Sequence, residues 1–263
     1  MPSVVLDPVL CSGATGATQS LGADVATYVL VHGGGHGGWC WQRLTPLLRA
    51  AGHEVYTPTL TGLGERAHLL RPDMDLETHI ADVVGVLQYE GCTDIVLVGH
   101  SYGGMVITGV ADRAAERVGR LVYLDAAIPE DGQSLVAVAG MLMAAARAGA
   151  RVVDGVELVL WPDSDAVQYY GITEPEDVEW MWDKLTPHPW KCFEQPLRLN
   201  DPAALARIPR AEIHTTSSLA MAPPGTAEAL AGQEQTWVVD SGHDLMVTAP
   251  KAVAEILLGL AVR

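Results

Sequence analysis

Positive charge is scarce in this chain of 263 residues. Its 16 lysines and arginines are outnumbered by 32 aspartates and glutamates, which gives a formal net charge of −16 and a pI of about 4.8. Nucleic acids and anionic lipid surfaces are themselves negative, so binding to either is unfavourable. We therefore expect a small, neutral molecule as the binding partner, with no nucleic acid and no membrane.

Long hydrophobic runs are also lacking, and we expect no leader sequence. Apolar residues make up 49% of the chain, yet no uninterrupted run approaches the ~20 residues of a membrane-spanning helix. The N-terminus has no basic start followed by an apolar core and a cleavage site. We expect a cytoplasmic protein in which residues 1–25 form an N-terminal extension, and whether this extension is ordered stays open.

Cysteine pairs and nucleotide motifs are missing as well. Cys11, Cys40, Cys92 and Cys192 lie far apart and show no C-x-x-C spacing, which is typical of buried thiols rather than of a metal or disulfide site. The glycine-rich loop that begins at Gly33 lacks the G-K-[ST] ending of a phosphate-binding loop. We expect no metal and no cofactor.

Short apolar segments alternate with helical patterns along most of the chain. The predicted strands are 27–31, 54–57, 95–98, 121–124, 211–215 and 236–239, and the predicted helices are 41–51, 76–87, 103–115 and 250–260. Repeated strand–helix units favour a mostly parallel central sheet with helices on both faces. The fold class is therefore α/β, with one core formed by residues 26–131 and 208–263.

Residues 132–207 interrupt this alternation. An alanine-rich helix is predicted around 141–148, and an aromatic-rich segment follows it, so we interpret the region as a helical cap over the sheet. Ligand pockets are mostly apolar with few polar groups. We therefore predict a substrate pocket lined by Gly33, Trp161, Trp180, Trp182 and Trp190. The alternative is that these aromatic side chains pack in the core, and we expect this of about half of the aromatic residues in the cap.

The strongest motif is G-x-S-x-G at residues 99–103. An apolar strand precedes it and a helix is predicted after it, which is the setting of a tight strand-to-helix turn that exposes a nucleophilic serine. Side chains at the two flanking positions would clash in so sharp a turn. Ser101 is the predicted nucleophile.

A serine hydroxyl needs a base, and in this architecture the base comes last along the chain. His243 lies in the segment 241–244 that follows the predicted strand 236–239, at the edge of the sheet where Ser101 also lies. An oxyanion hole requires preorganised N–H groups. We predict that Tyr102 and Gly34 supply them, because one follows the nucleophile and the other lies in the loop after the first strand.

Three segments together resemble a known group of proteins. These are 28–41 (YVLVHGGGHGGWCW), 99–105 (GHSYGGM) and 242–246 (GHDLM). They are similar to the α/β-hydrolase branch that contains plant methyl esterases, hydroxynitrile lyases and many bacterial esterases. The resemblance runs from about residue 27 to the C-terminus. It implies the α/β-hydrolase fold with a cap, and the same roles for Ser101 and His243.

The third member of a catalytic triad departs from the pattern of this branch. Its members usually carry an aspartate after the strand before the last one, where this chain has Ser218. Asp125 follows the predicted strand 121–124, a position at which some other α/β-hydrolases carry their acid. A carboxylate there could orient His243 and stabilise its protonated form. We predict Asp125 as the acid, with Glu130 and Asp131 as open alternatives.

These residues predict a serine hydrolase that cleaves a carboxylic ester, lactone or thioester of a hydrophobic or aromatic small molecule through an acyl-enzyme. Lyase relatives typically carry a threonine and a lysine where this chain has Gly33 and Asp244, which disfavours lyase activity. The alternative is a ligand-binding, lyase or tailoring protein on the same scaffold. The choice of substrate and the presence of a homodimer stay open.

Overall fold

The computed structural model describes residues 25–163, 165–230 and 233–261, so residues 1–24 of the predicted extension lie outside the described residues. A six-stranded sheet forms its centre, and its strands lie in the order β2-β1-β3-β4-β8-β9 with parallel pairing throughout. This confirms the predicted α/β class. The strands are β1 (Thr27–Val31), β2 (Glu54–Tyr56), β3 (Ile95–His100), β4 (Val118–Leu124), β8 (Arg210–Thr215) and β9 (Thr236–Val239).

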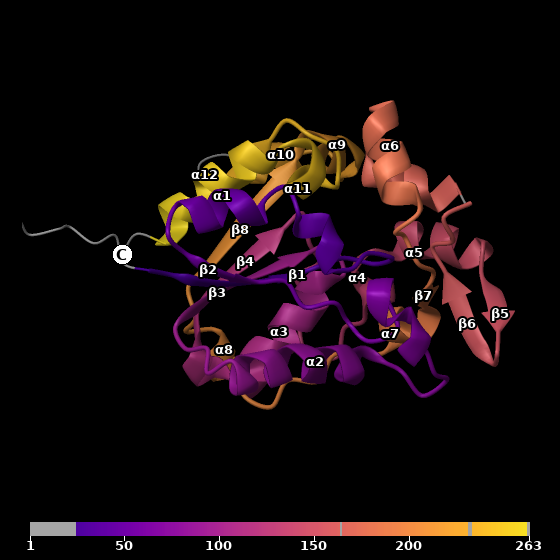
Figure 1. The fold of residues 1–263 in the computed structure, drawn as a ribbon, viewed down its shortest axis with the longest axis horizontal. Coiled ribbons are helices and arrows are strands. Elements are labelled where there is room, and N and C mark those ends of the chain that lie inside the picture. Colours follow the sequence, from indigo (N-terminus) through magenta and orange to yellow (C-terminus); the bar gives the residue numbers. More distant parts are fainter. Residues whose placement is uncertain (1–24, 164, 231–232, 262–263) are drawn as a thin grey trace, which may run out of the picture.

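Helices cover both faces of this sheet (Figure 1). One face carries α1 (Thr45–Ala50), α11 (Leu245–Thr248) and α12 (Pro250–Ala261), and the other carries α2 (Leu76–Tyr89) and α3 (Gly103–Arg113). Each layer has its own hydrophobic cluster. All six residues of β3 are buried, because this central strand is covered from both sides. The shorter elements α8 (Pro202–Leu205), α9 (Thr216–Met221), α10 (Thr226–Leu230), η2 (Gly64–Leu69) and η3 (Ala115–Arg117) complete the core.

The ends of the helices follow local sequence signals. Asp75 accepts a hydrogen bond from Thr78 N, and the Thr78 side chain binds back to Asp75 N, so a capping box begins α2. The predicted helix at 41–51 is wrong as a single element. It is divided into a 3-10 turn η1 (Gly38–Trp41) and α1, because Pro46 favours a new helical start.

The segment predicted as a cap contains the helices α4 (Leu135–Val138), α5 (Gly140–Ala148), α6 (Pro175–Trp182) and α7 (Trp190–Glu194), with a 3-10 turn η4 (Asp165–Tyr170). It also contains a three-stranded antiparallel sheet of β5 (Arg151–Val153), β6 (Val156–Val159) and β7 (His188–Pro189), which the prediction of a helical cap did not include. Asp154 and Gly155 both have positive φ and form the β5–β6 turn. An Asp-Gly pair between apolar residues is a hairpin signal.

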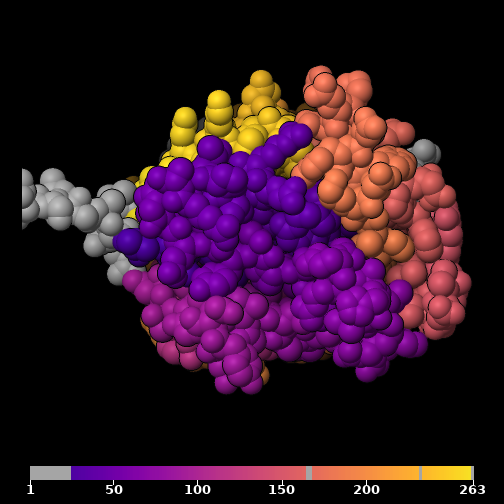
Figure 2. All heavy atoms as spheres, viewed as in Figure 1, coloured from indigo at the N-terminus to yellow at the C-terminus, as the bar shows by residue number. Residues whose placement is uncertain are grey.

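On the face seen in Figure 2, this segment (salmon to orange) lies directly against the N-terminal half of the chain (indigo to purple). Within the described residues, no helix is long and apolar enough to cross a membrane. Cys40, Cys92 and Cys192 are buried free thiols, as predicted, and Cys11 lies outside the described part of the chain.

Candidate active site

Ser101 lies in the sharp turn between β3 and α3. Its φ is +54°, a left-handed conformation that is uncommon for a residue other than glycine. A Cβ atom at Gly99 would lie 2.6 Å from Gly103 O, and one at Gly103 would lie 2.6 Å from Val31 O. The turn therefore requires both glycines of the motif, and it holds the serine in a strained conformation of the kind found at functional sites.

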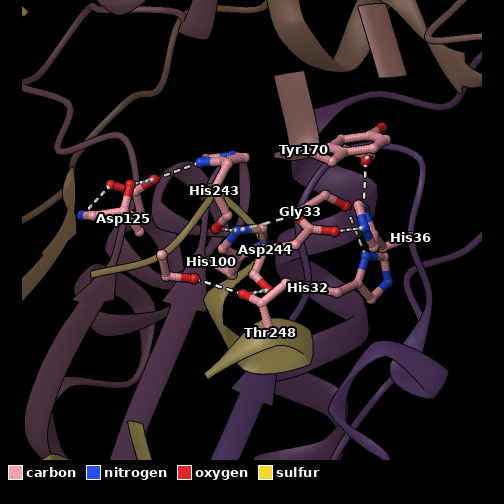
Figure 3. A network of polar contacts seen from close by, with 12 residues as sticks. His32, Gly33, His36, His100, Asp125, Tyr170, His243, Asp244 and Thr248 are labelled. Carbon is pink, nitrogen blue, oxygen red and sulfur yellow. Dashed lines mark hydrogen bonds and ion pairs between the residues drawn. The ribbon is translucent and has the colours of Figure 1, made fainter. Parts of the chain in front are cut away.

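Asp125 occupies the equivalent place on the neighbouring strand. The last pair of residues in the β3–β4 register is His100 and Leu124, so Ser101 and Asp125 follow at the same edge of the sheet. Asp125 also has a positive φ, +47°. Its Oδ2 lies 2.6 Å from Nδ1 of His243, which is a short hydrogen bond between buried groups (Figure 3). The structure thus brings together the predicted base and the predicted acid.

The Asp125 carboxylate is held by further donors. Thr215 donates from its backbone N to Oδ1 (3.2 Å) and from its hydroxyl to Oδ2 (3.1 Å), and Ser218 Oγ donates to Oδ2 at 2.5 Å. Burial by itself would raise the pKa of Asp125, but the hydrogen bonds and the charge of His243 outweigh burial and leave this pKa below its ordinary value of 3.8. The group is therefore a carboxylate at neutral pH.

His243 is only 3% exposed and lies in the loop after β9. Because the Asp125 carboxylate accepts from Nδ1–H, the lone pair of the neutral ring is on Nε2. Nε2 has no hydrogen-bond partner among the described residues. The ring packs against Tyr169, with centroids 4.6 Å apart, and the backbone oxygen of His243 accepts a hydrogen bond from His100 Nε2 at 3.0 Å. This arrangement suits Nε2 to accept a proton.

The glycine-rich loop after β1 lies beside Ser101. A Cβ at Gly33 would lie 2.8 Å from Ser101 Cβ, so the absence of a side chain permits this close approach. Gly34 and Ser101 line the same pocket. The Tyr102 backbone directly follows Ser101 at the start of α3, while its buried hydroxyl is 2.9 Å from His79 Nδ1. Both predicted oxyanion donors thus belong to segments next to Ser101, and their catalytic role stays a prediction.

An apolar pocket opens at Ser101. The cap supplies most of its wall, and the residues that line it are Gly34, Ser101, Leu142, Met143, Ala145, Ala146, Leu160, Tyr169, Tyr170 and Phe193. Neither Gly33 nor any of the four predicted tryptophans is in this lining. Sequence reasoning identified an aromatic cap but selected the wrong aromatic residues for the wall of this pocket.

The tryptophans have other packing partners. Trp161 packs under Arg151, with the guanidinium 4.7 Å from the ring centroid, and Trp180 packs against Trp39 and Arg43. Trp190 is 2% exposed, and its Nε1 donates to Glu194. Trp182 is 43% exposed. Their large apolar area serves the packing of the cap, which is the other interpretation open to an aromatic-rich segment.

A comparison with known families and proteins agrees with this geometry. The family model described as the alpha/beta hydrolase family matches residues 28–256. The chain belongs to this family. An esterase from a Nocardioides strain, named for hydrolyzing carbendazim, is 59% identical over 113 residues, which are 43% of this chain and 47% of that protein. Esterase PIR7B from Oryza sativa subsp. japonica is 27% identical over 267 residues, which cover 89% of this alpha/beta hydrolase and 95% of that protein.

Solved structures show the same fold. The crystal structure of a methylesterase from Arabidopsis has a TM-score of 0.69 at 25% identity, and the match covers 90% of this chain and 98% of that one. The match to the carbendazim-hydrolyzing protein spans about half of its length, whereas the match to the rice esterase spans nearly all of it. These relatives are named as esterases, and the motifs resemble the branch that contains plant methyl esterases.

Two clusters of this alpha/beta hydrolase bring potential metal-ligand atoms within 4.8 Å of one another, namely His79 with His188 and Cys192, and His100 with His243 and Asp244. Hydrogen bonds already engage members of both. His79 binds the Tyr102 hydroxyl through Nδ1 and Thr61 O through Nε2, and His243 Nδ1 binds Asp125. We assign both clusters to polar packing around the site.

Several buried polar groups at the site escaped sequence reasoning. His36, in the glycine-rich loop, pairs with Asp244 across 208 positions of the chain, and His100 lies between Asp244 and the His243 backbone. The signal was present in the motifs, because His100 directly precedes Ser101, Asp244 directly follows His243, and His36 lies two residues after Gly34. No local pattern, however, predicts which of them pair in space.

Proposed function

We propose that this protein is a serine hydrolase that cleaves a carboxylic ester of a hydrophobic or aromatic small molecule through an acyl-enzyme. The observation that carries the proposal is the 2.6 Å Asp125–His243 hydrogen bond at the same sheet edge as Ser101, whose φ of +54° is typical of a nucleophile turn.

The reaction begins when His243 Nε2 accepts the Ser101 hydroxyl proton while Oγ attacks the carbonyl carbon of the ester. The carbonyl oxygen becomes the oxyanion, which the N–H groups of Gly34 and Tyr102 stabilise. The C–O bond to the alcohol then breaks, and His243 returns the proton to the leaving oxygen. A water molecule attacks the acyl-enzyme by the same steps and releases the acid and free Ser101.

The apolar lining of the pocket indicates a hydrophobic substrate. Its wall includes aliphatic side chains from α5 and rings from η4 and α7, and Ser101 belongs to the same lining. An apolar substituent gains about 0.8 kcal/mol for each buried CH₂ group. The relatives are named as esterases, and one is named for carbendazim, which makes esters and carbendazim itself the first substrates to test. Lactones and thioesters follow, since they need the same attack at a carbonyl carbon.

The test is covalent labelling of the full chain with a fluorophosphonate probe, together with turnover of a graded panel of esters, lactones and thioesters. We expect Ser101 to carry the label, and we expect Ser101→Ala to abolish both labelling and turnover. Ser134→Ala is a matched control, because Ser134 caps α4 away from the pocket lining. If the wild type shows neither label nor turnover, the protein is a ligand-binding or tailoring protein and the proposal fails.

A further inference from the structure

A buried polar network connects the glycine-rich loop to the segment of Asp244 (Figure 3). The side chains of His36 and Asp244 are both fully buried, and His36 Nε2 lies 2.8 Å from Asp244 Oδ2. The other ring nitrogen, Nδ1, lies 2.8 Å from Gly34 O. Both distances are those of strong hydrogen bonds.

The partners of the ring determine how many protons it carries. Gly34 O is a carbonyl oxygen and can only accept, and the Asp244 carboxylate can only accept when it is ionised. With an ionised Asp244, both nitrogens of His36 must therefore donate, and the ring is a cation. Burial alone would lower the pKa of His36 and raise that of Asp244, but their mutual charge and hydrogen bond outweigh burial and shift both pKa values the opposite way.

The other groups that face the pair are consistent with this charge state. The Trp39 ring stacks on His36 with centroids 5.3 Å apart, which favours a cation. His100 Nε2 lies 3.7 Å from Asp244 Oδ1 and donates to the His243 backbone, and burial lowers the pKa of His100 to about 3, so this ring is neutral. The nearby Cys40 thiol and Tyr170 hydroxyl are neutral too, because burial raises both of their pKa values.

The pair acts on the loop through one carbonyl group. Gly34 O accepts from His36 Nδ1 and also from the Tyr170 hydroxyl at 3.0 Å, so two donors fix the carbonyl side of Gly34, the residue whose N–H is the proposed oxyanion donor. Asp244 is anchored in turn, because its backbone N donates to Tyr170 O at 2.9 Å. Consecutive glycines have the largest conformational freedom of any residues, and a loop built from them needs such external constraints to stay in one conformation.

We propose that the buried His36–Asp244 ion pair is a positioning device that holds Gly34 in the conformation required to bind the oxyanion. The proposal rests on the proposed hydrolase function. Because Asp244 directly follows His243, the pair also ties the loop of the base to the loop of the oxyanion hole. His36 and Asp244 are positioning residues, since they act through Gly34 rather than on the substrate.

The protonation state is tested on the wild-type protein by NMR of the ¹⁵N-labelled histidine rings. We expect both ring nitrogens of His36 to be protonated at pH 8, when an exposed histidine is neutral. A His36 ring with one unprotonated nitrogen at this pH would overturn the ion pair. This measurement requires no enzymatic activity, so it stands whether or not the proposed hydrolase function survives.

The positioning role is tested with two replacements of His36. Asparagine places its amide N–H near the position of Nδ1 and retains a donor to Gly34 O, whereas glutamine reaches toward Asp244 and loses that donor. We expect His36→Asn to retain several-fold more kcat/KM and fluorophosphonate labelling than His36→Gln. Equal activities, or a more active glutamine variant, would contradict a role through Gly34.

Asp244→Asn provides the complementary measurement. We expect kcat/KM and the rate of labelling to fall by about 10- to 100-fold, less than or similar to the direct loss of one oxyanion donor, with a smaller change in KM. Asp240→Asn is the matched control, since Asp240 is an exposed carboxylate on the same loop. A lower melting temperature with unchanged kcat/KM in Asp244→Asn would show a purely structural pair and overturn the positioning role.

Discussion

At the scale of single residues, the Asp125 carboxylate is the best-connected group of the site. It accepts hydrogen bonds from Thr215 N, Thr215 Oγ1, Ser218 Oγ and His243 Nδ1. A carboxylate held by so many donors keeps its charge and its direction. It therefore fixes both the tautomer of His243 and the rotation of the ring, as the proposed mechanism requires of its acid.

Replacement of Asp125 by asparagine tests this role. The amide can donate to Nδ1, which favours the tautomer with the proton on Nε2 and removes the lone pair that the mechanism requires. We expect kcat to fall by about 10⁴-fold while the fold is retained. The measurement is ester turnover, with circular dichroism as the check on folding. Asp240→Asn should behave like the wild type, and a near wild-type rate in Asp125→Asn would remove Asp125 from the triad.

Ser218 offers a sharper version of this experiment. Its Oγ lies 2.5 Å from the Asp125 oxygen that binds His243, so a carboxylate at position 218 would lie close to the same imidazole. We expect the double variant Asp125→Asn, Ser218→Asp to be at least tenfold more active than the single variant Asp125→Asn. Ser217→Asp in the same background is the control, because Ser217 contacts Thr215 and not Asp125. Recovery in the control alone would argue against a carboxylate acting from position 218.

Some residues of the site could be predicted from the sequence alone, whereas others could not. Ser101 and His243 are recognisable because their chemistry depends on immediate neighbours along the chain, a glycine turn and a strand end. The pairing of His243 with Asp125 spans 118 positions, and Glu130 and Asp131 could not be set aside without the fold. The structure brings Asp125, not these two, to His243. Whether a tryptophan faces a pocket or the core likewise depends on tertiary packing.

At the scale of elements, the turn from β3 into α3 depends on very close backbone packing. A Cβ at Gly104, in the first turn of α3, would lie 2.0 Å from Ala127 O, a backbone atom that cannot move aside alone. The segment after Asp125 therefore fits against α3 only if residue 104 is glycine. This packing also fixes Ser101, whose backbone oxygen accepts from Gly104 N and Ala127 N, each at 3.1 Å.

Gly104→Ala is predicted to destabilise the protein by about 1 to 3 kcal/mol, the usual cost of forcing extra volume into a packed site, and to reduce kcat as Ser101 shifts. The free energy of unfolding in urea measures the first effect. Gly85→Ala is the control: Gly85 lies inside α2, and a Cβ there meets nothing within 4 Å. Alanine at position 85 should instead stabilise the helix by about 0.5 to 1 kcal/mol. Similar effects at both sites would contradict the packing argument.

The elements themselves were predictable where local signals are strong. The buried strand β3 and the helix α2 follow from an apolar run and from helical spacing. The strands β5 and β6 were missed although their turn contains Asp154-Gly155, because exposed β5 residues give no alternating burial pattern. Strand pairing within the cap is decided by tertiary contacts, which propensity does not include.

At the scale of the whole molecule, the buried carboxylates make the stability of the fold depend on pH. The pKa values of Asp125 and Asp244 lie below their ordinary value of 3.8 in the folded protein. Their contribution to stability is fully present above this ordinary value and is lost as the pH falls through the lowered values. We expect the urea midpoint to fall steeply below pH 3.8. Asp244→Asn should be less stable at pH 6 and should lose less stability on acidification; an unchanged pH dependence would show that Asp244 does not titrate in this way.

The pocket is a joint product of core and cap. The core contributes Ser101 and Gly34, whereas α5 contributes Leu142, the residue that directly follows the exposed Met141. If the acyl chain of the substrate lies against Leu142, an aspartate at this position will weaken binding, and it will do so more for a longer apolar acyl chain than for a shorter one. We expect Leu142→Asp to lower the ratio of kcat/KM for p-nitrophenyl hexanoate over p-nitrophenyl acetate by at least tenfold. Met141→Asp adds the same charge at a side chain that is 89% exposed and should leave the ratio unchanged. A constant ratio in both variants would place the acyl chain outside this pocket, whereas equal falls in both would indicate a general charge effect.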